Sequence, residues 1–240
     1  MKERNVWLDP SRGRALEQQK FLVMRALTEI VKPTVSTYTP KNGTVIEIGA
    51  GTAYGRTMMP SDFQGRYLAV DINIENLSWG KRMHGLQDFI AADAQRLPFV
   101  DSFADSVIAQ DTLDTLPNLG KAFASFKRVL KPGGHIIHFA TVQPFSEKVQ
   151  SVPTKADPLA PIKAYQRILQ ETAANTNLLV IESDIRTADL IGARNKNHSE
   201  IPANTFIQLI GQVIGTKDER LQSGLVRENA MAYVFVAKKP

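Results

Sequence analysis

Seven short apolar runs along the chain have the length and the β-branched character of buried strands. They span residues 44–51, 66–73, 88–93, 105–111, 135–142, 178–185 and 232–239. Between the fourth and fifth runs, residues 118–130 carry apolar side chains at helical spacing, and the turn sequence KPGG (131–134) follows them. Strands that alternate with helices pair in parallel through right-handed crossovers, which bury both faces of the sheet. The pattern therefore predicts an α/β fold with a mostly parallel, seven-stranded sheet and helices on both faces.

Three further stretches predict helices outside this alternation. Ser11 can cap a leading helix whose apolar residues recur at helical spacing until Pro33 ends it. A second helix is expected over 162–175. About 45 residues separate the last two strands, whereas connections of about four to six residues are usual. We expect an α-helical insertion there, with a helix over 203–214 that begins after Pro202.

Composition and charge exclude several classes of protein. The chain has no cysteine and only four histidines among 240 residues, so we expect no metal site. No apolar run reaches the roughly 18 residues of a membrane span, and the amino-terminal residues lack the apolar core of a secretory signal. The formal charge of +5 is spread along the chain, which argues against a nucleic-acid partner. We expect a single cytoplasmic domain with a small-molecule substrate, and the sequence does not set its oligomeric state.

The strongest local motif is EIGAGTA (47–53), which lies where the first strand gives way to the next element. Glycines there let the backbone approach a ligand, and amide groups at such a turn can receive a carboxylate or a phosphate. A dinucleotide fingerprint of the form G-x-G-x-x-G would place its third glycine at Tyr54, and Gly55 comes one residue late. The motif therefore disfavours a nucleotide pyrophosphate.

Acidic residues accompany this motif at three strand ends. Glu47 lies two residues before Gly49, Asp71 closes the second strand, and Asp93 closes the third. A carboxylate about 20 residues after the glycines can accept hydrogen bonds from ribose hydroxyls, and open parallel sheets bind ligands beyond the carboxyl ends of their strands. Each acid taken singly is as well explained by a turn or a helix cap. Together they indicate a ligand that carries adenosine.

The ordered set of motifs resembles the class I S-adenosylmethionine-dependent methyltransferases. The set comprises VIEIGAGT (45–52), VDIN (70–73), AADAQRLPFVDSFADSVIAQDTLDTL (91–116) and RVLKPGG (128–134). Within that class it is similar to the ubiquinone and menaquinone biosynthesis C-methyltransferase branch (methyltransferase type 11), over about residues 44–142. The resemblance implies a Rossmann-like, doubly wound fold, S-adenosyl-L-methionine as the cofactor, and methyl transfer as the activity.

The resemblance also implies which residues of the glycine motif bind the cofactor. Gly49 and Gly51 would pass its methionine part, with Ala50 and Thr52 beside them in the same loop. Glu47 would support that loop from the preceding strand.

Later strand ends would complete the cofactor site. By resemblance, Asp71 would hold the ribose hydroxyls and Ile72 would pack on the adenine. Asp93 and the amide of Ala94 would read the adenine edge.

The end of the fourth strand would face the reacting groups. There the resemblance implies that Gln110 and Asp111 approach the sulfonium and the acceptor. No catalytic residue is assigned, because methyl transfer does not strictly require a general base. If the acceptor must lose a proton, the candidates near the strand ends are Asp111, Asp114 and His138.

The chain departs from the family pattern at several places. Ala53 replaces the third motif glycine, a mild change if it begins a helix, and Pro60 must keep the following helix short. Ala104 is an extra residue, and Asp114-Thr115 stands where family members often have a histidine-containing pair. A catalytically silent cofactor-binding protein therefore stays an alternative, with an RNA methyltransferase and a nicotinamide-dependent dehydrogenase as weaker ones.

The single domain is expected to contain parts with different tasks. Residues 1–33 form the leading helix and 44–142 the cofactor-binding core, whereas 144–175 and 185–230 lie on the substrate side. The acceptor is expected to be a small molecule, among which apolar, lipid-like or quinone-like compounds suit the branch that the chain resembles.

Overall fold

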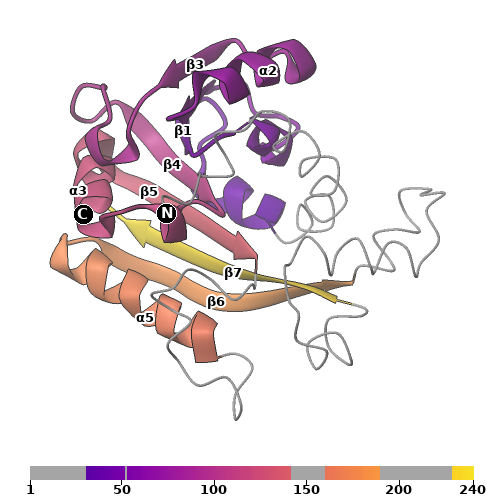
Figure 1. Cartoon of the computed structure of the whole chain (residues 1–240). Helices are drawn as coiled ribbons and strands as arrows, with labels where there is room; N and C mark the ends of the chain where they lie inside the picture. The colour runs from indigo at the N-terminus through magenta and orange to yellow at the C-terminus, as the bar shows by residue number, and fades with distance from the viewer. Residues whose placement is uncertain (1–30, 52, 142–159, 190–228) are drawn as a thin grey trace, which may run out of the picture.

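The computed structural model describes residues 31–51, 53–141, 160–189 and 229–240, which form an α/β fold around one seven-stranded sheet (Figure 1). The strand order is β3-β2-β1-β4-β5-β7-β6. From β1 the chain builds outward to β3 and then returns to place β4 on the other side of β1. This reversal creates a topological switch point between β1 and β4, where open α/β sheets bind ligands beyond the carboxyl ends of their strands.

Five strands run parallel to one another, as the alternating pattern predicts. They are β1 (Thr44–Ile48), β2 (Arg66–Asp71), β3 (Asp88–Ala91), β4 (Ala104–Gln110) and β5 (Leu130–Thr141). Parallel ladders join β1 to β2 and β4, β2 to β3, and β4 to β5. The first three strands end two or three residues before the predicted runs do, so Gly49, Gly51 and Asp93 lie beyond the strand ends. Glu47, Asp71 and Gln110 instead lie within the last two residues of β1, β2 and β4.

The last two strands are antiparallel to their neighbours. The strand β6 (Leu179–Asp189) forms one edge of the sheet, and β7 (Asn229–Lys238) lies between it and β5. Both strands extend beyond the apolar runs that predict them. The sheet is thus mostly parallel with an antiparallel end, which agrees with the predicted fold class.

Helices cover both faces of the sheet (Figure 1). On one face, α3 (Leu119–Val129) and α5 (Ala160–Asn175) bury their apolar stripes against the strands. On the other face, the helical residues 31–38 and α2 (Ile74–His84) pack against a second apolar cluster. The expected helix over 162–175 is α5, and the helix predicted before β5 is α3.

The leading helix does not end at Pro33, contrary to the prediction, because residues 31–38 are helical. Val35 is fully buried in the core, and the Tyr38 hydroxyl donates a hydrogen bond to Glu182 Oε1 on β6 at 2.5 Å. These tertiary contacts hold residues 31–38 against the sheet. Residues 1–30, including Ser11, lie outside the described residues.

The sequence reasoning missed α2. The Asn73 side chain caps this helix by accepting a hydrogen bond from the amide of Glu75 at 2.9 Å, and Gly85 ends it with a φ of +63°. These two residues were the available signal. The helix buries little, with Leu77 its fully buried apolar side chain, so its apolar stripe is weak.

The predicted turn at residues 131–134 lies within β5, which begins at Leu130. Gly133 has a φ of +78°, and its amide donates to the Lys239 carbonyl at 2.9 Å. The Lys239 amide donates in turn to the Gly134 carbonyl at 2.9 Å. The glycines therefore bond to the chain just after β7, and this distant partner keeps them in the sheet.

Several predictions fall on residues that the structure does not describe. They are the segment 144–159 and the insertion up to residue 228, with its expected helix over 203–214. Among the residues that are described, no helix is both long and apolar enough to cross a membrane.

Candidate functional site

The loop after β1 contains residues in the left-handed backbone conformation, which set its shape. Gly49 and Gly51 have φ values of +64° and +53°, a region that side chains disfavour. A Cβ on Gly49 would also come within 2.3 Å of the Thr112 side chain, which follows β4. Gly49 therefore allows the ends of β1 and β4 to approach each other. Sequence reasoning missed Thr112, because nothing local marks it as the partner of a glycine so distant in sequence.

Gly51 lies against the carboxylate that ends β2. The Gly51 amide donates to Asp71 Oδ2 and the Asn73 amide donates to Asp71 Oδ1, each at 2.8 Å. Apart from Gly51 and its chain neighbours, no described residue has an atom within 4 Å of the position that a Cβ on Gly51 would take. The structure thus brings the glycine motif and Asp71 together, with open space beside the backbone of Gly51.

Ile72 provides an apolar surface at the same edge of the sheet. Its side chain is 73% exposed, although it directly follows a buried strand. An isoleucine so exposed beside a carboxylate offers a face on which a flat apolar ring could lie.

Glu47 lies beneath the loop and not at its open side. Its side chain is buried, accepts a hydrogen bond from the Tyr67 hydroxyl, and occupies the space that a Cβ on Gly55 would need. Burial raises the pKa of Glu47 to about 8, with the Tyr67 hydrogen bond lowering it and the Asp71 charge raising it. The Arg56 guanidinium stands 5.6 Å from the centre of the Tyr67 ring. Glu47 is therefore a buried carboxyl that packs the loop from inside.

The expectation that Ala53 is a mild replacement for glycine is wrong. Ala53 has a φ of +62° and precedes the 3-10 helix η2 (Tyr54–Met58) as its cap, so it does not begin a helix. A left-handed alanine costs about 1–2 kcal/mol through the contact of its Cβ with the backbone. The helix after the loop is short, as Pro60 predicts.

The turn after β3 lies next to the end of β2. The Ala92 amide donates to the Asp71 carbonyl at 2.9 Å. Asp93 lies two residues after β3 and caps the 3-10 helix η3 (Ala94–Arg96), where its Oδ1 accepts from the Gln95 amide at 2.8 Å. The helix-cap alternative for Asp93 is thus realised, and the Gln95 side-chain amide also donates to its Oδ1 at 3.2 Å and to its Oδ2 at 3.3 Å.

Gln110 and Asp111 stand at the end of β4 and are half-buried. Asp111 has a φ of +44°, uncommon for a residue with a side chain, and its amide donates to the Phe139 carbonyl at 2.8 Å. The Thr112 hydroxyl donates to the Gln110 carbonyl at 2.6 Å and links this strand end to Gly49. Backbone of this kind persists where its surroundings enforce it, commonly at functional sites.

His138 is not a general base. It is fully buried on β5, and burial lowers its pKa to about 4. Its Nδ1 lies 2.9 Å from the Ala109 carbonyl oxygen, which can only accept, so Nδ1 carries the proton. Its Nε2 therefore accepts from the Tyr165 hydroxyl of α5 at 3.0 Å. A neutral imidazole with both nitrogens engaged joins α5 to the sheet.

Of the remaining candidate residues, the structure describes Asp114 but not Thr52. Asp114 belongs to the 3-10 helix η4 (Leu113–Thr115), close enough to Tyr165 that its charge adds to burial in raising the pKa of that phenol. Thr52 lies outside the described residues. Among the residues that are described, no group of three or more histidine, aspartate or glutamate side chains could hold a metal ion.

The chemistry of this edge suits an adenosine-bearing ligand. Asp71 offers acceptors for hydroxyl groups, Ile72 an apolar face, and Gly51 open space beside backbone that bears no side chain. The donors and acceptors expected for a cofactor with a ribose and an aromatic base are therefore present in the described residues.

Comparison with known proteins matches the same part of the chain. A family model described as a methyltransferase domain matches residues 46–138. The fatty-acid O-methyltransferase of Mycolicibacterium smegmatis is 26% identical over 133 residues, 54% of this chain and 48% of that protein. The ubiquinone/menaquinone biosynthesis C-methyltransferase of Pseudomonas paraeruginosa is 33% identical over 123 residues, 47% of this chain and 45% of that protein. The chain thus spans about half the length of these two relatives.

A solved structure agrees on the fold. Geranyl diphosphate methyltransferase, in complex with S-adenosylmethionine, aligns with a TM-score of 0.60 and 14% identity, covering 97% of this chain and 92% of that one. The strand order and the matched segment agree with this likeness. Residues 46–138 thus match a methyltransferase domain, and the chain has the fold of the class I S-adenosylmethionine-dependent methyltransferases.

Proposed function

We propose that this chain transfers the methyl group of S-adenosyl-L-methionine to a small-molecule acceptor. The observation that carries the proposal is the edge where the Gly51 amide meets the Asp71 carboxylate and Ile72 stands exposed beside them. This edge lies next to the switch point between β1 and β4, within the segment that matches the methyltransferase domain.

The chain's own residues would bind and orient the cofactor. Asp71 would accept hydrogen bonds from the ribose hydroxyls, and two backbone amides already fix its carboxylate, so little ordering is needed on binding. Ile72 would pack on the adenine ring. Asp93 and the Ala94 amide, which follow the neighbouring strand, would read the edge of that ring.

The glycine loop would border the methionine part of the cofactor. Gly49, Ala50, Gly51 and Thr52 are the proposed contacts, and the open space beside Gly51 supports this placement. Glu47 would act from beneath, by keeping the loop in place through its contacts with Tyr67 and Gly55.

When bound, the cofactor supplies a methyl group activated by its sulfonium. The contribution of the chain is to hold donor and acceptor close and aligned, which can lower a barrier by about 7–11 kcal/mol. Gln110 and Asp111 would face the reacting groups from the end of β4. An acceptor that must lose a proton would give it to a carboxylate, with Asp111 the candidate, because His138 is buried and engaged at both nitrogens.

The acceptor that we propose is apolar and lipid-like or quinone-like. The relative from Mycolicibacterium smegmatis is named for fatty acids, and that from Pseudomonas paraeruginosa for ubiquinone and menaquinone biosynthesis. These names share long apolar compounds, which supports this class over a nucleic acid.

Titration calorimetry of the full chain with S-adenosylhomocysteine tests cofactor binding. We expect the wild-type chain to bind and Asp71→Asn to weaken binding about tenfold or more, because the variant removes a charged acceptor. Asp88→Asn is the matched control, since Asp88 pairs with Arg66 at 2.7 Å on the exposed start of the neighbouring strand and should leave binding unchanged. Absence of binding by the wild-type chain would overturn the proposal.

Methyl transfer is then measured with methyl-labelled cofactor and three acceptor pools: fatty acids, reduced quinones and RNA. We expect product from the fatty-acid or quinone pool, lost in Asp71→Asn and kept in Asp88→Asn. Product from the RNA pool alone would show that the acceptor is RNA and not an apolar small molecule. Cofactor binding without transfer to any pool would favour a silent binding protein.

A further inference from the structure

The segment from Asp93 to Ser102 contains little regular structure of its own. After η3 it has neither helix nor strand before β4 begins. Its backbone amides and carbonyls therefore need partners elsewhere in the molecule, since buried polar groups left without hydrogen bonds are costly.

Two side chains one helical turn apart on α3 supply such partners to Leu97. The Leu97 amide donates to Ser125 Oγ at 3.0 Å, and Arg128 Nη2 donates to the Leu97 carbonyl at 2.6 Å. Residues three apart on a helix share one face, so both bonds come from the same side of α3. We call Ser125 and Arg128 the α3 clamp.

Arg128 extends this hold along the segment. Its Nη1 donates to the Phe99 carbonyl at 2.6 Å and to Asp101 Oδ1 at 2.9 Å, and its own carbonyl accepts from the Ser102 amide at 3.1 Å. The Asp101 side chain is 77% exposed, so that ion pair contributes little. The two carbonyl bonds are charge-assisted and need the planar fork of an arginine.

The clamped segment directly continues the turn at Asp93 and Ala94. On one side of this turn the Ala92 amide bonds to the Asp71 carbonyl at the end of β2. On the other side, the Arg96 amide bonds to the Asp93 carbonyl, and Leu97 enters the clamp. The position of the turn relative to Asp71 and Ile72 is therefore set from both sides.

We propose that Ser125 and Arg128 are positioning residues that set the base selectivity of the cofactor site by fixing the turn at Asp93 and Ala94. This inference rests on the proposed function, in which that turn reads the edge of the adenine ring. If the clamp is released, the turn moves relative to Ile72. Discrimination between rings is then lost, although Asp71 and the glycine loop are untouched.

Two ligands that differ only in the edge of the base test this role. S-adenosylhomocysteine carries an amino group on its ring, and S-inosylhomocysteine carries a carbonyl oxygen there. The dissociation constants of both are measured by calorimetry, and their ratio reports the selectivity. Arg128→Met removes the fork and keeps an unbranched side chain like the aliphatic part of the arginine.

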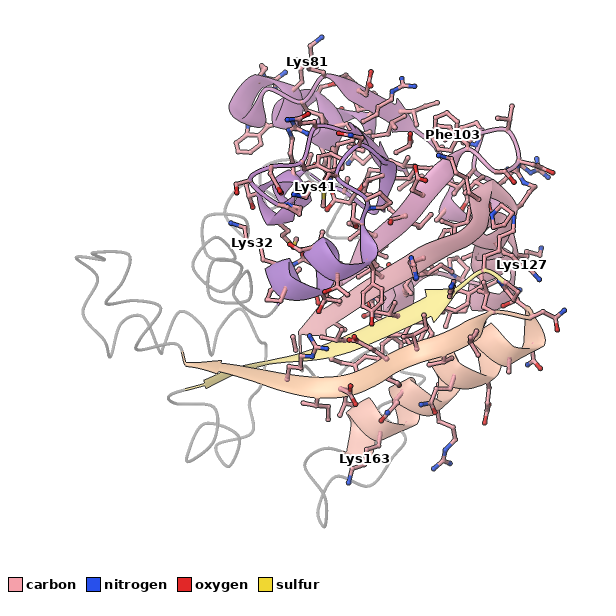
Figure 2. All side chains as sticks on the ribbon, turned by 180° about the vertical axis from the view of Figure 1, so that it is seen from behind. Lys32, Lys41, Lys81, Phe103, Lys127 and Lys163 are labelled. Carbon is pink, nitrogen blue, oxygen red and sulfur yellow. The ribbon has the colours of Figure 1, made fainter. Side chains whose placement is uncertain are left out.

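Lys127→Met is the matched control. Lys127 is the preceding residue on α3 and carries the same charge, but its Nζ donates to the Thr176 carbonyl at the end of α5, at 2.9 Å. Lys127→Met therefore removes a comparable bond that does not reach the turn. Figure 2 labels Lys127 and also Phe103, whose ring stacks on that of Phe99 in the clamped segment with the ring centres 5.0 Å apart.

We expect the wild-type chain to bind S-adenosylhomocysteine about tenfold or more tightly than S-inosylhomocysteine. A site built to accept a hydrogen bond from an amino group rejects a carbonyl oxygen at the same position. In Arg128→Met the preference should fall below about threefold through weaker binding of S-adenosylhomocysteine, with Arg128→Lys in between. Lys127→Met should keep the wild-type ratio. If Arg128→Met does not fold, Ser125→Ala takes its place with the same expectation.

The outcomes separate the two proposals. A wild-type chain that binds neither ligand would overturn the proposed function and the clamp's role with it. A wild-type chain that binds both ligands equally would overturn the clamp's role alone. An Arg128→Met variant that melts at a lower temperature but keeps the wild-type ratio would show a purely structural role and overturn the inference.

Discussion

The turns after β1 and β3 lie at the same edge of the sheet, yet they are held in different ways. The first takes its shape from its own backbone, because Gly49, Gly51 and Ala53 all have positive φ. The second leads directly into a segment held by side chains of α3, where Ser125 and Arg128 bond to the backbone of Leu97. A turn set by its own backbone is sensitive to any added Cβ, whereas one held by a distant helix is sensitive to changes far away in sequence.

The largest effect should come from adding a methyl group at Gly49. We expect Gly49→Ala to lower the free energy of unfolding by about 3 kcal/mol, because collision with Thr112 adds to the strain of the left-handed backbone. Gly51→Ala should cost only about 1 kcal/mol. Its new Cβ strains the left-handed backbone but collides with none of the described residues. Urea unfolding followed by circular dichroism measures both. Equal costs at the two glycines would contradict a close approach of β4.

The second largest effect is a change in the free energy of unfolding with pH, caused by Glu47. Its pKa in the folded chain is about 8, against 4.5 when exposed, so the folded state binds its proton more tightly. This stability is fully present below about pH 4.5 and is lost as the pH rises through about 8. We expect the wild-type chain to lose about 2–3 kcal/mol of unfolding free energy between about pH 6 and pH 8, at about 1.4 kcal/mol per pH unit.

Glu47→Gln should remove this dependence, and Tyr67→Phe should extend it. The Tyr67 hydrogen bond lowers the pKa of Glu47, so its loss raises that pKa. The pH range over which the chain loses stability then extends to higher pH. Urea unfolding of the three proteins at several pH values measures this. An unchanged slope in Glu47→Gln would show that another group carries the pH dependence.

A smaller loss of stability is expected from a change at Ser125, which holds the segment after β3. Ser125→Ala should lower the free energy of unfolding by about 1–2 kcal/mol, because the buried amide of Leu97 loses its acceptor. The exposed neighbour Ala124 offers a control, since Ala124→Ser measures the helix propensity of the same two residue types without that bond. Thermal and urea unfolding report both. If Ser125→Ala stabilised the chain as propensity alone would, the bond to Leu97 would carry no stability.

The smallest effect should be a gain at Ala53. Ala53→Gly relieves about 1–2 kcal/mol of left-handed strain and loses about 0.8 kcal/mol of methyl burial. We therefore expect a stabilisation of about 0.5 kcal/mol, seen as a slightly higher melting temperature. A loss of stability would show that packing of the methyl group outweighs the backbone strain.

Much of the fold was predictable from the sequence. The seven apolar runs correspond to the seven strands, and the stripes before β5 and over 162–175 correspond to α3 and α5. The helix α2 was missed because its apolar stripe is weak, and Pro33 was misjudged because contacts with the sheet stabilise the helix across it. The single domain, its division into segments and the cytoplasmic location stay predictions.

The candidate site was predictable in part. Gly51, Asp71 and Ile72 follow strands that the pattern already placed side by side, so their meeting could be expected. Thr112 could not be expected, because its contact with Gly49 depends on how closely β1 and β4 approach. His138 was wrongly considered as a base, since nothing in its local sequence shows that Tyr165 of α5 covers it.

The sequence by itself determined the strands, the helices α3 and α5 and the glycines of the first turn. These depend on periodicity and on the steric limits of single residues, which act within a few positions of the chain. Only the tertiary structure decided the burial of Glu47, the neutral state of His138 and the hold of Arg128 on Leu97 and Phe99. Desolvation and hydrogen bonding depend on which distant side chains meet, and packing of the helices on the sheet settles that.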